Sequence, residues 1–417
     1  MTVTLSNEKC KKIISLCQSI LDKEPLSVRD LAQLIGKFVA CSPAVPHATV
    51  FYKRLEILRN RVLQVSKGNY DSVIHLTNAC REDIKWWITN LASCEKSVIT
   101  NDYNIALFTD SSLEGWGAVM NGKSTGGLWD INEKNNHINY LELKAVLLAL
   151  QSFCKNMQDI HIRIRSDNTT TVICINKQGS SKSKLNDITR EIWLFAIERM
   201  IWLSAEHVKG SDNVQADQES RKFNLDTEWK LNEHVFKSIC KVFGTPDIVL
   251  FANRLNCQVS RYYSWRADPN AVAVDAFLQS WSNELNYLFS PFSVIGQALQ
   301  KIQQEQAEAI IVAPAWPTQV WFPQMIKMCI TCPLLLPVRD NLLMLPDKIC
   351  SHPLLKKLHL AVFRVSGDSS KPKAYQTMLL TSFCNHGKVP QKLSMGVISK
   401  DGCIFVVNGI PIPFHHM

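Results

Sequence analysis

Apolar and polar residues alternate in short stretches along the middle of the chain, which is the pattern of half-buried strands. In the clearest stretch, Ile-His-Ile-Arg-Ile-Arg-Ser-Asp at residues 160–167, the apolar residues fall on every second position until the strand ends. The dipeptide Asn121-Gly122 favours a tight β-hairpin. Five strands are predicted, at residues 105–110, 118–120, 127–129, 160–167 and 200–205.

Apolar residues at helical spacing occur between these strands and upstream of them. After Asn139 the apolar positions lie on one helix face, at Leu143, Val146, Leu147 and Leu150. Residues 5–97 are helical by pattern, and Ser27 with Asp30 forms a capping box before an apolar stripe. We therefore expect a helical segment over residues 1–100, followed by an α/β domain over residues 103–221.

Residues 230–345 predict a second, smaller α/β domain after a polar linker at 222–228. A helix is expected at 236–242, ended by Gly244, and a buried strand at 247–252. Residues 346–417 are expected to form an irregular tail with strands at 377–383 and 402–407, and no function is assigned to it.

Composition places the chain among ordinary globular proteins, with 46% hydrophobic and 20% charged residues in 417. The formal net charge of +9 has the sign expected for a phosphate-backbone partner, although many basic proteins bind no nucleic acid. The polar start Met1-Thr-Val-Thr does not resemble a secretory signal, so we expect the 14 cysteines to be reduced and the protein intracellular, in the cytoplasm or nucleus. No apolar run reaches the roughly 18 residues that span a bilayer, so no membrane partner is expected.

Four acids stand where predicted strands end or helices begin: Asp110, Glu142, Asp167 and Asp217. Each has an ordinary alternative role. Glu142 has the spacing of a capping-box glutamate, Asp110 or Asp167 could cap the structure that follows, and Asp217 could be a solvated helix residue. Their joint placement within one five-strand unit favours a shared site.

Converging carboxylates need a cation, because like charges close together cannot all stay ionised. Mg²⁺ is the natural counter-charge for oxygen ligands, with Mn²⁺ as an alternative ion. Two such ions roughly 3.5–4 Å apart clamp both the attacking and the leaving oxygen of a phosphodiester. The sequence therefore predicts a two-ion centre.

The blocks that contain these acids, Thr109-Asp110-Ser-Ser, Tyr140-Leu-Glu142-Leu, Ser166-Asp167-Asn and Asn213-Val-Gln-Ala-Asp217, resemble those of ribonuclease H domains in retrotransposon reverse transcriptases. The sequences Ser166-Asp-Asn-Thr-Thr and His207-Val-Lys-Gly210 resemble those of DIRS-like elements, which carry a tyrosine recombinase. The resemblance implies a ribonuclease H-like five-stranded mixed sheet with helices. It also implies hydrolysis of the RNA strand of RNA–DNA hybrids, with other parts of a retrotransposon polyprotein as partners.

Under this resemblance, Asp110, Glu142 and Asp167 hold one Mg²⁺, and Asp110 with Asp217 holds the other. Contacts to 2′-hydroxyls in the minor groove would select RNA. The candidate substrate contacts are Ser111, Ser112, Asn168 and His207. His207 is expected at a strand end, and the loop 209–212 contains no histidine of the kind that assists many ribonucleases H.

The N-terminal helical segment resembles the thumb and connecting helices at the end of a reverse transcriptase. The sequence contains no Tyr-x-Asp-Asp polymerase motif, so we do not expect polymerisation by that mechanism. Two other readings remain open: a non-catalytic nucleic-acid-binding or scaffolding remnant of a transposon, and a structure-selective nuclease of the wider ribonuclease H-like superfamily.

The order of Asp247-Ile-Val-Leu-Phe, Asp275-Ala-Phe and Phe289-Ser-Pro-Phe292 resembles phage-type DNA adenine methyltransferase domains of DIRS-like elements. Those enzymes use Asn/Asp-Pro-Pro-Tyr/Phe, in which the first side chain accepts hydrogen bonds from the target amine. When Pro291 and Phe292 are aligned, Phe289 takes that first position and Ser290 replaces the first proline. Phenylalanine accepts no such bond, so a degenerate, inactive fold is expected; a generic α/β domain kept for packing is the alternative.

Overall fold

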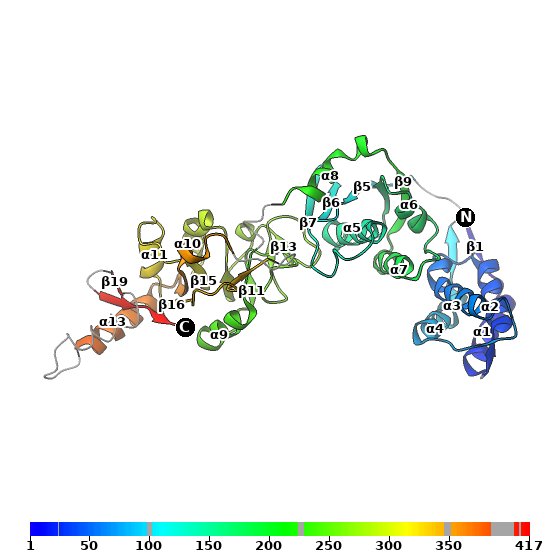
Figure 1. The fold of residues 1–417 in the computed structure, drawn as a ribbon, viewed down its shortest axis with the longest axis horizontal. Helices are drawn as coiled ribbons and strands as arrows, with labels where there is room; N and C mark the ends of the chain where they lie inside the picture. Colours follow the sequence, from blue (N-terminus) through cyan, green and yellow to red (C-terminus); the bar gives the residue numbers. More distant parts are fainter. Residues whose placement is uncertain (24, 98–101, 224–228, 346–351, 385–403, 408–409) are drawn as a thin grey trace. The chain divides into compact units, whose positions relative to one another are not determined.

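The computed structural model describes residues 1–23, 25–97, 102–223, 229–345, 352–384, 404–407 and 410–417 (Figure 1). These residues form two compact units. The first unit contains residues 1–127 and 135–221, and the second contains residues 128–134 and 222–417. No helix in the described ranges is long and apolar enough to cross a membrane.

Four helices form the N-terminal part of the first unit: α1 (Asn7–Asp22), α2 (Val28–Cys41), α3 (Lys53–Val65) and α4 (Asn78–Asn90). The predicted capping box at the start of α2 is confirmed, because Ser27 Oγ accepts from the Asp30 N–H while Asp30 Oδ2 accepts from the Ser27 N–H. This part also contains two short antiparallel strand pairs. They are β1 (Thr2–Thr4) with β4 (Glu95–Ser97), and β2 (Leu26–Ser27) with β3 (Val73–Ile74).

The five-stranded mixed sheet predicted for the next part of the unit is confirmed. Its order is β7 (Lys123–Leu128), β6 (Gly115–Met120), β5 (Ile105–Ser111), β8 (His161–Ser166) and β9 (Trp202–His207). β5 runs antiparallel to β6 and parallel to β8, and β8 runs parallel to β9. The third strand was predicted at 127–129 but lies at Lys123–Leu128, because the Asn121-Gly122 turn starts it directly.

Four helices accompany this sheet: α5 (Ile138–Phe153), α6 (Thr169–Asn176), α7 (Ser183–Glu198) and α8 (Val214–Arg221). α5 packs on β5 and β6 and against α7, and every residue from Leu141 to Leu150 except Lys144 is buried. α8 lies against β6 and β5 instead. α5 and α8 carry the two acids that do not come from strands.

The N-terminal helices are joined to α7 by a buried ion pair and by aromatic packing. Arg190 Nη2 lies 2.6 Å from Asp83 Oδ1, and the Asp83 side chain is fully buried. Burial raises the pKa of the Asp83 carboxyl, and the Arg190 charge opposes this shift. The His47 ring lies 5.0 Å from the Trp193 ring and 4.9 Å from the Trp202 ring. The helical segment thus packs against α7 and the edge strand β9 of the five-stranded unit.

The second unit contains a six-stranded sheet with the order β11 (Ile248–Val249), β14 (Leu285–Leu288), β15 (Glu308–Pro314), β18 (Leu360–Ser366), β16 (Leu334–Leu335) and β21 (His415–His416). β11, β14 and β15 are parallel, whereas β18 is antiparallel to β15. Alternate β15 residues enter two separate apolar clusters, one with α10 (Ile295–Gln304) and one with α9 (Glu233–Phe243). β15 is therefore buried on both faces, which explains its unbroken apolar run.

Three predictions for this unit need correction. Residues 360–366 pair with β15 along their whole length, so the region beyond 345 contributes to the sheet and is not an irregular tail. The strand predicted at 377–383 lies in helix α13 (Ser370–Cys384), where Tyr375 and Leu379, four residues apart, are buried together. The strand predicted at 247–252 is limited to Ile248–Val249.

Other predictions for this unit are confirmed in part. The helix expected at 236–242 is α9, which is capped by Gly244 at φ +92°. Of the strand expected at 402–407, Ile404–Val407 form β19, and the first two residues lie outside the described ranges. Most of the expected linker, 224–228, also lies outside them.

Gly117 has no side chain, so the backbone of α8 can lie directly against the backbone of β6. A Cβ atom at this position would lie 2.2 Å from the Ala216 carbonyl oxygen and 2.5 Å from the Ser220 nitrogen. Gly126 on β7 is similarly restricted by the Trp116 and Glu219 carbonyl oxygens, at 2.5 and 2.9 Å. Only glycine fits at these two positions while α8 keeps its place.

Replacing Gly117 by alanine should therefore lower the free energy of unfolding by about 1–3 kcal/mol, because the new methyl group displaces α8. The matched control is Gly36→Ala in α2, where a Cβ meets no atom within 4 Å. That control should stabilise the protein by about 0.5–1 kcal/mol. Urea unfolding measures both effects, and an unchanged midpoint for Gly117→Ala would contradict the close packing of α8.

Candidate active site

The register of the central strands brings Asp110 and Asp167 to the same edge of the sheet. β5 and β8 are parallel, and Phe108 pairs with Arg165. Two residues further along the chain in each case, Asp110 and Asp167 therefore lie side by side. Asp110 is the penultimate residue of β5, and Asp167 directly follows β8. Parallel neighbours that end together carry their last side chains to one place.

Glu142 completes a cluster of three carboxylates. One oxygen each from Asp110, Glu142 and Asp167 lies within 4.8 Å of the others. Asp110 and Glu142 are each only 4% exposed, whereas Asp167 opens to solvent. The sequence prediction that these three acids converge agrees with this geometry.

The position of Glu142 in its helix excludes a capping role. α5 begins at Ile138, and its N-cap is His137, whose Nδ1 accepts from the Asn139 N–H. The capping-box spacing of Glu142 would require the N-cap to be Asn139, but the helix starts before that residue. Glu142 is the fifth residue of α5, beyond the third position where a capping-box glutamate stands.

Burial and like charge raise the pKa of both inner carboxyls. Burial is the main cause of the rise in the pKa of Glu142 to about 9, with the Asp110 and Asp167 charges adding to it and a hydrogen bond from the Ser111 N–H opposing it. The pKa of Asp110 is raised by burial and by Asp167 and Asp217, and a hydrogen bond from Ser220 opposes the rise. Glu142 Oε2 is buried without a hydrogen-bond partner among the described residues.

The structure brings Asp217 near this cluster but not into it. Asp217 lies in the first turn of α8, and its charge contributes to the raised pKa of Asp110. Its Oδ1 accepts a hydrogen bond from Arg221 Nε at 2.7 Å, one helical turn away. Both side chains of this pair are well exposed, at 42% for Asp217 and 61% for Arg221. An exposed pair of this kind contributes little stability, so Arg221 is a weak competitor for the carboxylate.

The two serines predicted as substrate contacts are buried. Ser111 is 6% and Ser112 is 8% exposed. Ser112 Oγ donates to the Ser220 carbonyl oxygen at 2.6 Å and accepts from the Glu114 and Gly115 N–H groups. Ser112 thus fixes the β5–β6 turn and α8, and its hydroxyl is not presented to a ligand.

Asn168 and His207 hold the loop around Asp167. Asn168 is the N-cap of α6, since its Oδ1 accepts from the Thr171 N–H, and its Nδ2 donates to Asn139 Oδ1. His207 ends β9 as predicted, and its Nε2 lies 3.0 Å from the Asp167 carbonyl oxygen. Both side chains therefore position the backbone that presents Asp167.

The structure adds two residues that sequence reasoning missed. Asn213 Nδ2 donates to the Thr109 carbonyl oxygen, and Ser220 Oγ donates to Asp110 Oδ2. Both side chains are buried on α8 or at its start. The sequence does offer a signal for Ser220, a small polar residue three positions after Asp217 and so on the same helix face.

The donor set fits divalent cations such as Mg²⁺. Carboxylate oxygens are the ligands that Mg²⁺ prefers, and two buried acids with raised pKa values gain from a positive charge that lets them ionise. The three clustered carboxylates fit one ion, and Asp110 with the nearby Asp217 fits a second after Arg221 releases Asp217.

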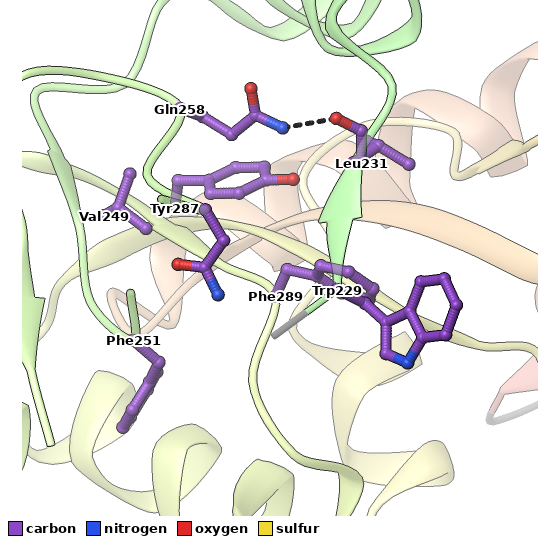
Figure 2. A pocket seen from close by; sticks show the side chains of 8 residues that line it. Trp229, Leu231, Val249, Phe251, Gln258, Tyr287 and Phe289 are labelled. Carbon is purple, nitrogen blue, oxygen red and sulfur yellow. Dashed lines mark hydrogen bonds between the residues drawn. The ribbon is translucent and has the colours of Figure 1, made fainter. Parts of the chain in front are cut away.

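In the second unit, Phe289 and Asp247 lie at opposite ends of parallel strands. Phe289 follows β14 and lines a small pocket with Trp229, Leu231 and Tyr287, which Figure 2 shows with the Gln258–Leu231 hydrogen bond. Asp247 precedes β11, and its Oδ2 accepts from the Leu285 N–H.

Three further residues of the predicted methyltransferase-like motif follow Phe289 in the chain. Ser290 is buried, Pro291 is the N-cap of a short 3₁₀ helix, and Phe292 begins that helix. Among the side chains of Phe289, Ser290, Pro291 and Phe292, only the Ser290 hydroxyl can accept a hydrogen bond, and it is 5% exposed.

Comparison with known proteins shows sequence similarity to viral polyproteins. The enzymatic polyprotein of Cauliflower mosaic virus (strain D/H) is 33% identical over 131 residues, which cover 28% of this chain and 19% of the polyprotein. That of Figwort mosaic virus (strain DxS) is 27% identical over 191 residues, 43% of this chain and 28% of the polyprotein. The chain thus spans only 19–28% of the length of these relatives. No protein-family model matches it.

Solved structures with similar regions include ribonuclease H1 from Halobacterium salinarum NRC-1, at 17% identity and a TM-score of 0.23 over 27% of this chain and 91% of that chain. A foamy viral protease-reverse transcriptase in complex with RNA/DNA hybrid matches at 13% identity and a TM-score of 0.21, over 48% of this chain and 27% of that one. Because both TM-scores are low, the fold is assigned from the strand order and register of this chain. Over part of its length the chain is homologous to caulimovirus enzymatic polyproteins.

The raised pKa of Glu142 predicts a pH-dependent stability in the presence of a chelator. Between pH 4.5 and about 9 the folded protein holds a proton that the unfolded chain releases, so the free energy of unfolding should fall as pH rises. Glu142→Gln removes this group, and its unfolding free energy should decline less steeply over that range.

Urea unfolding at several pH values checks this prediction, with Glu191→Gln on the exposed face of α7 as the matched control. The control should follow the wild type. Parallel curves for wild type and Glu142→Gln would show that Glu142 titrates as an ordinary glutamate.

Proposed function

We propose that this protein is a ribonuclease H-type endonuclease that hydrolyses the RNA strand of RNA–DNA hybrids with two Mg²⁺ ions, which Mn²⁺ can replace. The observation that carries the proposal is the convergence of Asp110, Glu142 and Asp167 within 4.8 Å at one edge of the five-stranded mixed sheet. The sequence similarity to caulimovirus enzymatic polyproteins supports it.

Each carboxylate has a role in holding the ions. Asp110, Glu142 and Asp167 would hold one ion, and Asp110 with Asp217 the other. Bound ions of this kind activate a water molecule and stabilise the departing sugar oxygen. The protein contributes the rigid frame, because Asp110 lies within a strand and Glu142 lies within a buried helix. Loop rearrangement is not needed to bring these two together.

The substrate would lie on the open side of the cluster, at Asp167. Asp167 is the exposed member of the three acids, and the partly exposed Asn168 lies beside it. Beyond its bonds to Thr171 and Asn139, the Asn168 amide has a second N–H and a second oxygen lone pair, and either can bond a 2′-hydroxyl, the group that distinguishes RNA from DNA. Since Ser111 and Ser112 are buried, we assign them to the backbone frame and retain Asn168 as the substrate contact, with His207 supporting its loop.

We also propose that the chain derives from a DIRS-like retrotransposon polyprotein and acts inside the cell with other parts of it. The sequences Ser166-Asp-Asn-Thr-Thr and His207-Val-Lys-Gly210, which resemble those of DIRS-like elements, support this origin. The chain covers only part of its viral relatives, and we do not assign their other activities to it.

Residues 230–345 of the second unit are proposed to be a degenerate adenine-methyltransferase-like domain without methyl transfer. The apolar Phe289 ring packs against the cluster that contains Trp229 and Tyr287, at the position where such enzymes need a hydrogen-bond acceptor. Asp247 lies at the other end of the strands and already accepts a backbone hydrogen bond.

Replacing Asp110 or Asp167 by asparagine should reduce hybrid cleavage at least about 1000-fold while the fold is retained, because loss of ion binding removes several kcal/mol of transition-state stabilisation. Asp212→Asn, an exposed acid in the loop before α8, is the matched control and should cleave at the wild-type rate. The assay compares hybrid, duplex RNA and duplex DNA. Undiminished cleavage by either variant places the chemistry elsewhere, whereas hybrid binding without cleavage by the wild type indicates a scaffolding protein.

Purified protein should transfer no label from isotope-labelled methyl donor to adenine-rich DNA, because flipping a base costs a few kcal/mol that only a specific pocket offsets. An active adenine methyltransferase serves as the positive control. Labelled DNA that disappears when Pro291 is replaced would establish a second activity for the chain.

A further inference from the structure

The helix that carries Asp217 is held to the sheet mainly by hydrogen bonds. Of the eight residues of α8, Ala216 and Ser220 are buried, so the helix has little apolar surface to pack. Asn213 Nδ2 bonds the Thr109 carbonyl oxygen at 3.0 Å at the start of the helix. Ser112 Oγ bonds the Ser220 carbonyl oxygen at 2.6 Å near its end.

Ser220 lies in the close contact between α8 and β6. Its backbone nitrogen would be 2.5 Å from a Cβ atom at position 117, and its side chain is fully buried. Its Oγ lies 2.6 Å from Asp110 Oδ2 and 2.9 Å from the Asp217 carbonyl oxygen. A serine hydroxyl carries one proton, and a carboxylate attracts it more strongly than a carbonyl group does, so the Asp110 contact is the stronger bond.

We propose that Ser220 is a positioning residue for the carboxylate centre, which fixes Asp110 and Asp217 relative to one another and so determines how tightly they hold a shared divalent ion. One side chain orients the Asp110 carboxylate and docks the helix that carries Asp217. The inference rests on the proposed metal centre and adds to it the residue that connects its two halves.

Ser124 offers a control that separates orientation of Asp110 from docking of α8. Ser124 Oγ, on β7, donates to Glu219 Oε1 at 3.0 Å, so it also ties α8 to the sheet. It makes no contact with Asp110 in the structure. A residue that acts only by docking the helix should therefore be mimicked by Ser124→Ala, whereas one that acts through Asp110 should not.

The experiment titrates the full-length protein with Mn²⁺ and follows binding by calorimetry and by the electron paramagnetic resonance of free Mn²⁺. Ser220→Ala should bind Mn²⁺ about 10–100-fold more weakly than wild type, the range found when partners that orient metal ligands are removed. Ser124→Ala should stay within about threefold of wild type. Ser220→Cys, which replaces the hydroxyl by a slightly larger group that donates only weakly, should show a loss close to that of Ser220→Ala.

The outcomes distinguish this inference from the proposed function. A wild-type protein that binds no Mn²⁺ refutes the metal centre itself. If wild type binds and Ser220→Ala binds equally well, or if Ser124→Ala loses as much affinity as Ser220→Ala, the positioning role is overturned. Thermal unfolding of each variant accompanies the titration. Should Ser220→Ala unfold below the titration temperature, the comparison between Ser220→Cys and Ser124→Ala decides the question.

Discussion

Repulsion between buried carboxylates is the constraint on which the first unit depends. Asp110 and Glu142 lie in the interior, close to Asp167. Without a bound cation, the protein reduces the repulsion by keeping Glu142 protonated at neutral pH, at which an ordinary glutamate is ionised. The carboxylates can remain close together only because other interactions stabilise the sheet and the helix that carry them. The strand pairing of β5 with β8 and the deep burial of α5 provide that stability.

The polar docking of α8 follows from the same constraint. A helix that must present an acid to an acidic centre cannot cover its inner face with large apolar side chains, because these would fill the space beside the carboxylates. The chain instead uses glycines on the strands and small hydrogen-bonding side chains on the helix. Short contacts between backbones replace the usual hydrophobic interface.

The five-stranded sheet and the positions of its acids could be predicted from the sequence, because the alternation of apolar residues and the ends of strands are local properties. The alternation of 160–167 located Asp167, and the hairpin at Asn121-Gly122 defined β6 and β7. The hydrogen bond from Ser220 to Asp110 and the burial of Ser112 depend on partners that are distant in the sequence, which periodicity does not encode. The helix at 370–384 was missed because its run of threonine, leucine and phenylalanine suits a strand equally well.

The ion pair between Asp83 and Arg190 has a consequence for how the chain can be divided. A fragment that began at the first strand of the five-stranded sheet would leave Arg190, whose side chain is 14% exposed, without its counter-charge. It would also remove the His47 ring from Trp193 and Trp202. Because deleting the helices would also open the Arg190 guanidinium to water, the larger loss is the packing over Trp193, which is 1% exposed in the intact chain. A fragment that starts at residue 103 would therefore expose aromatic surface on α7 and β9, so the N-terminal helices serve as part of the cover of the five-stranded unit.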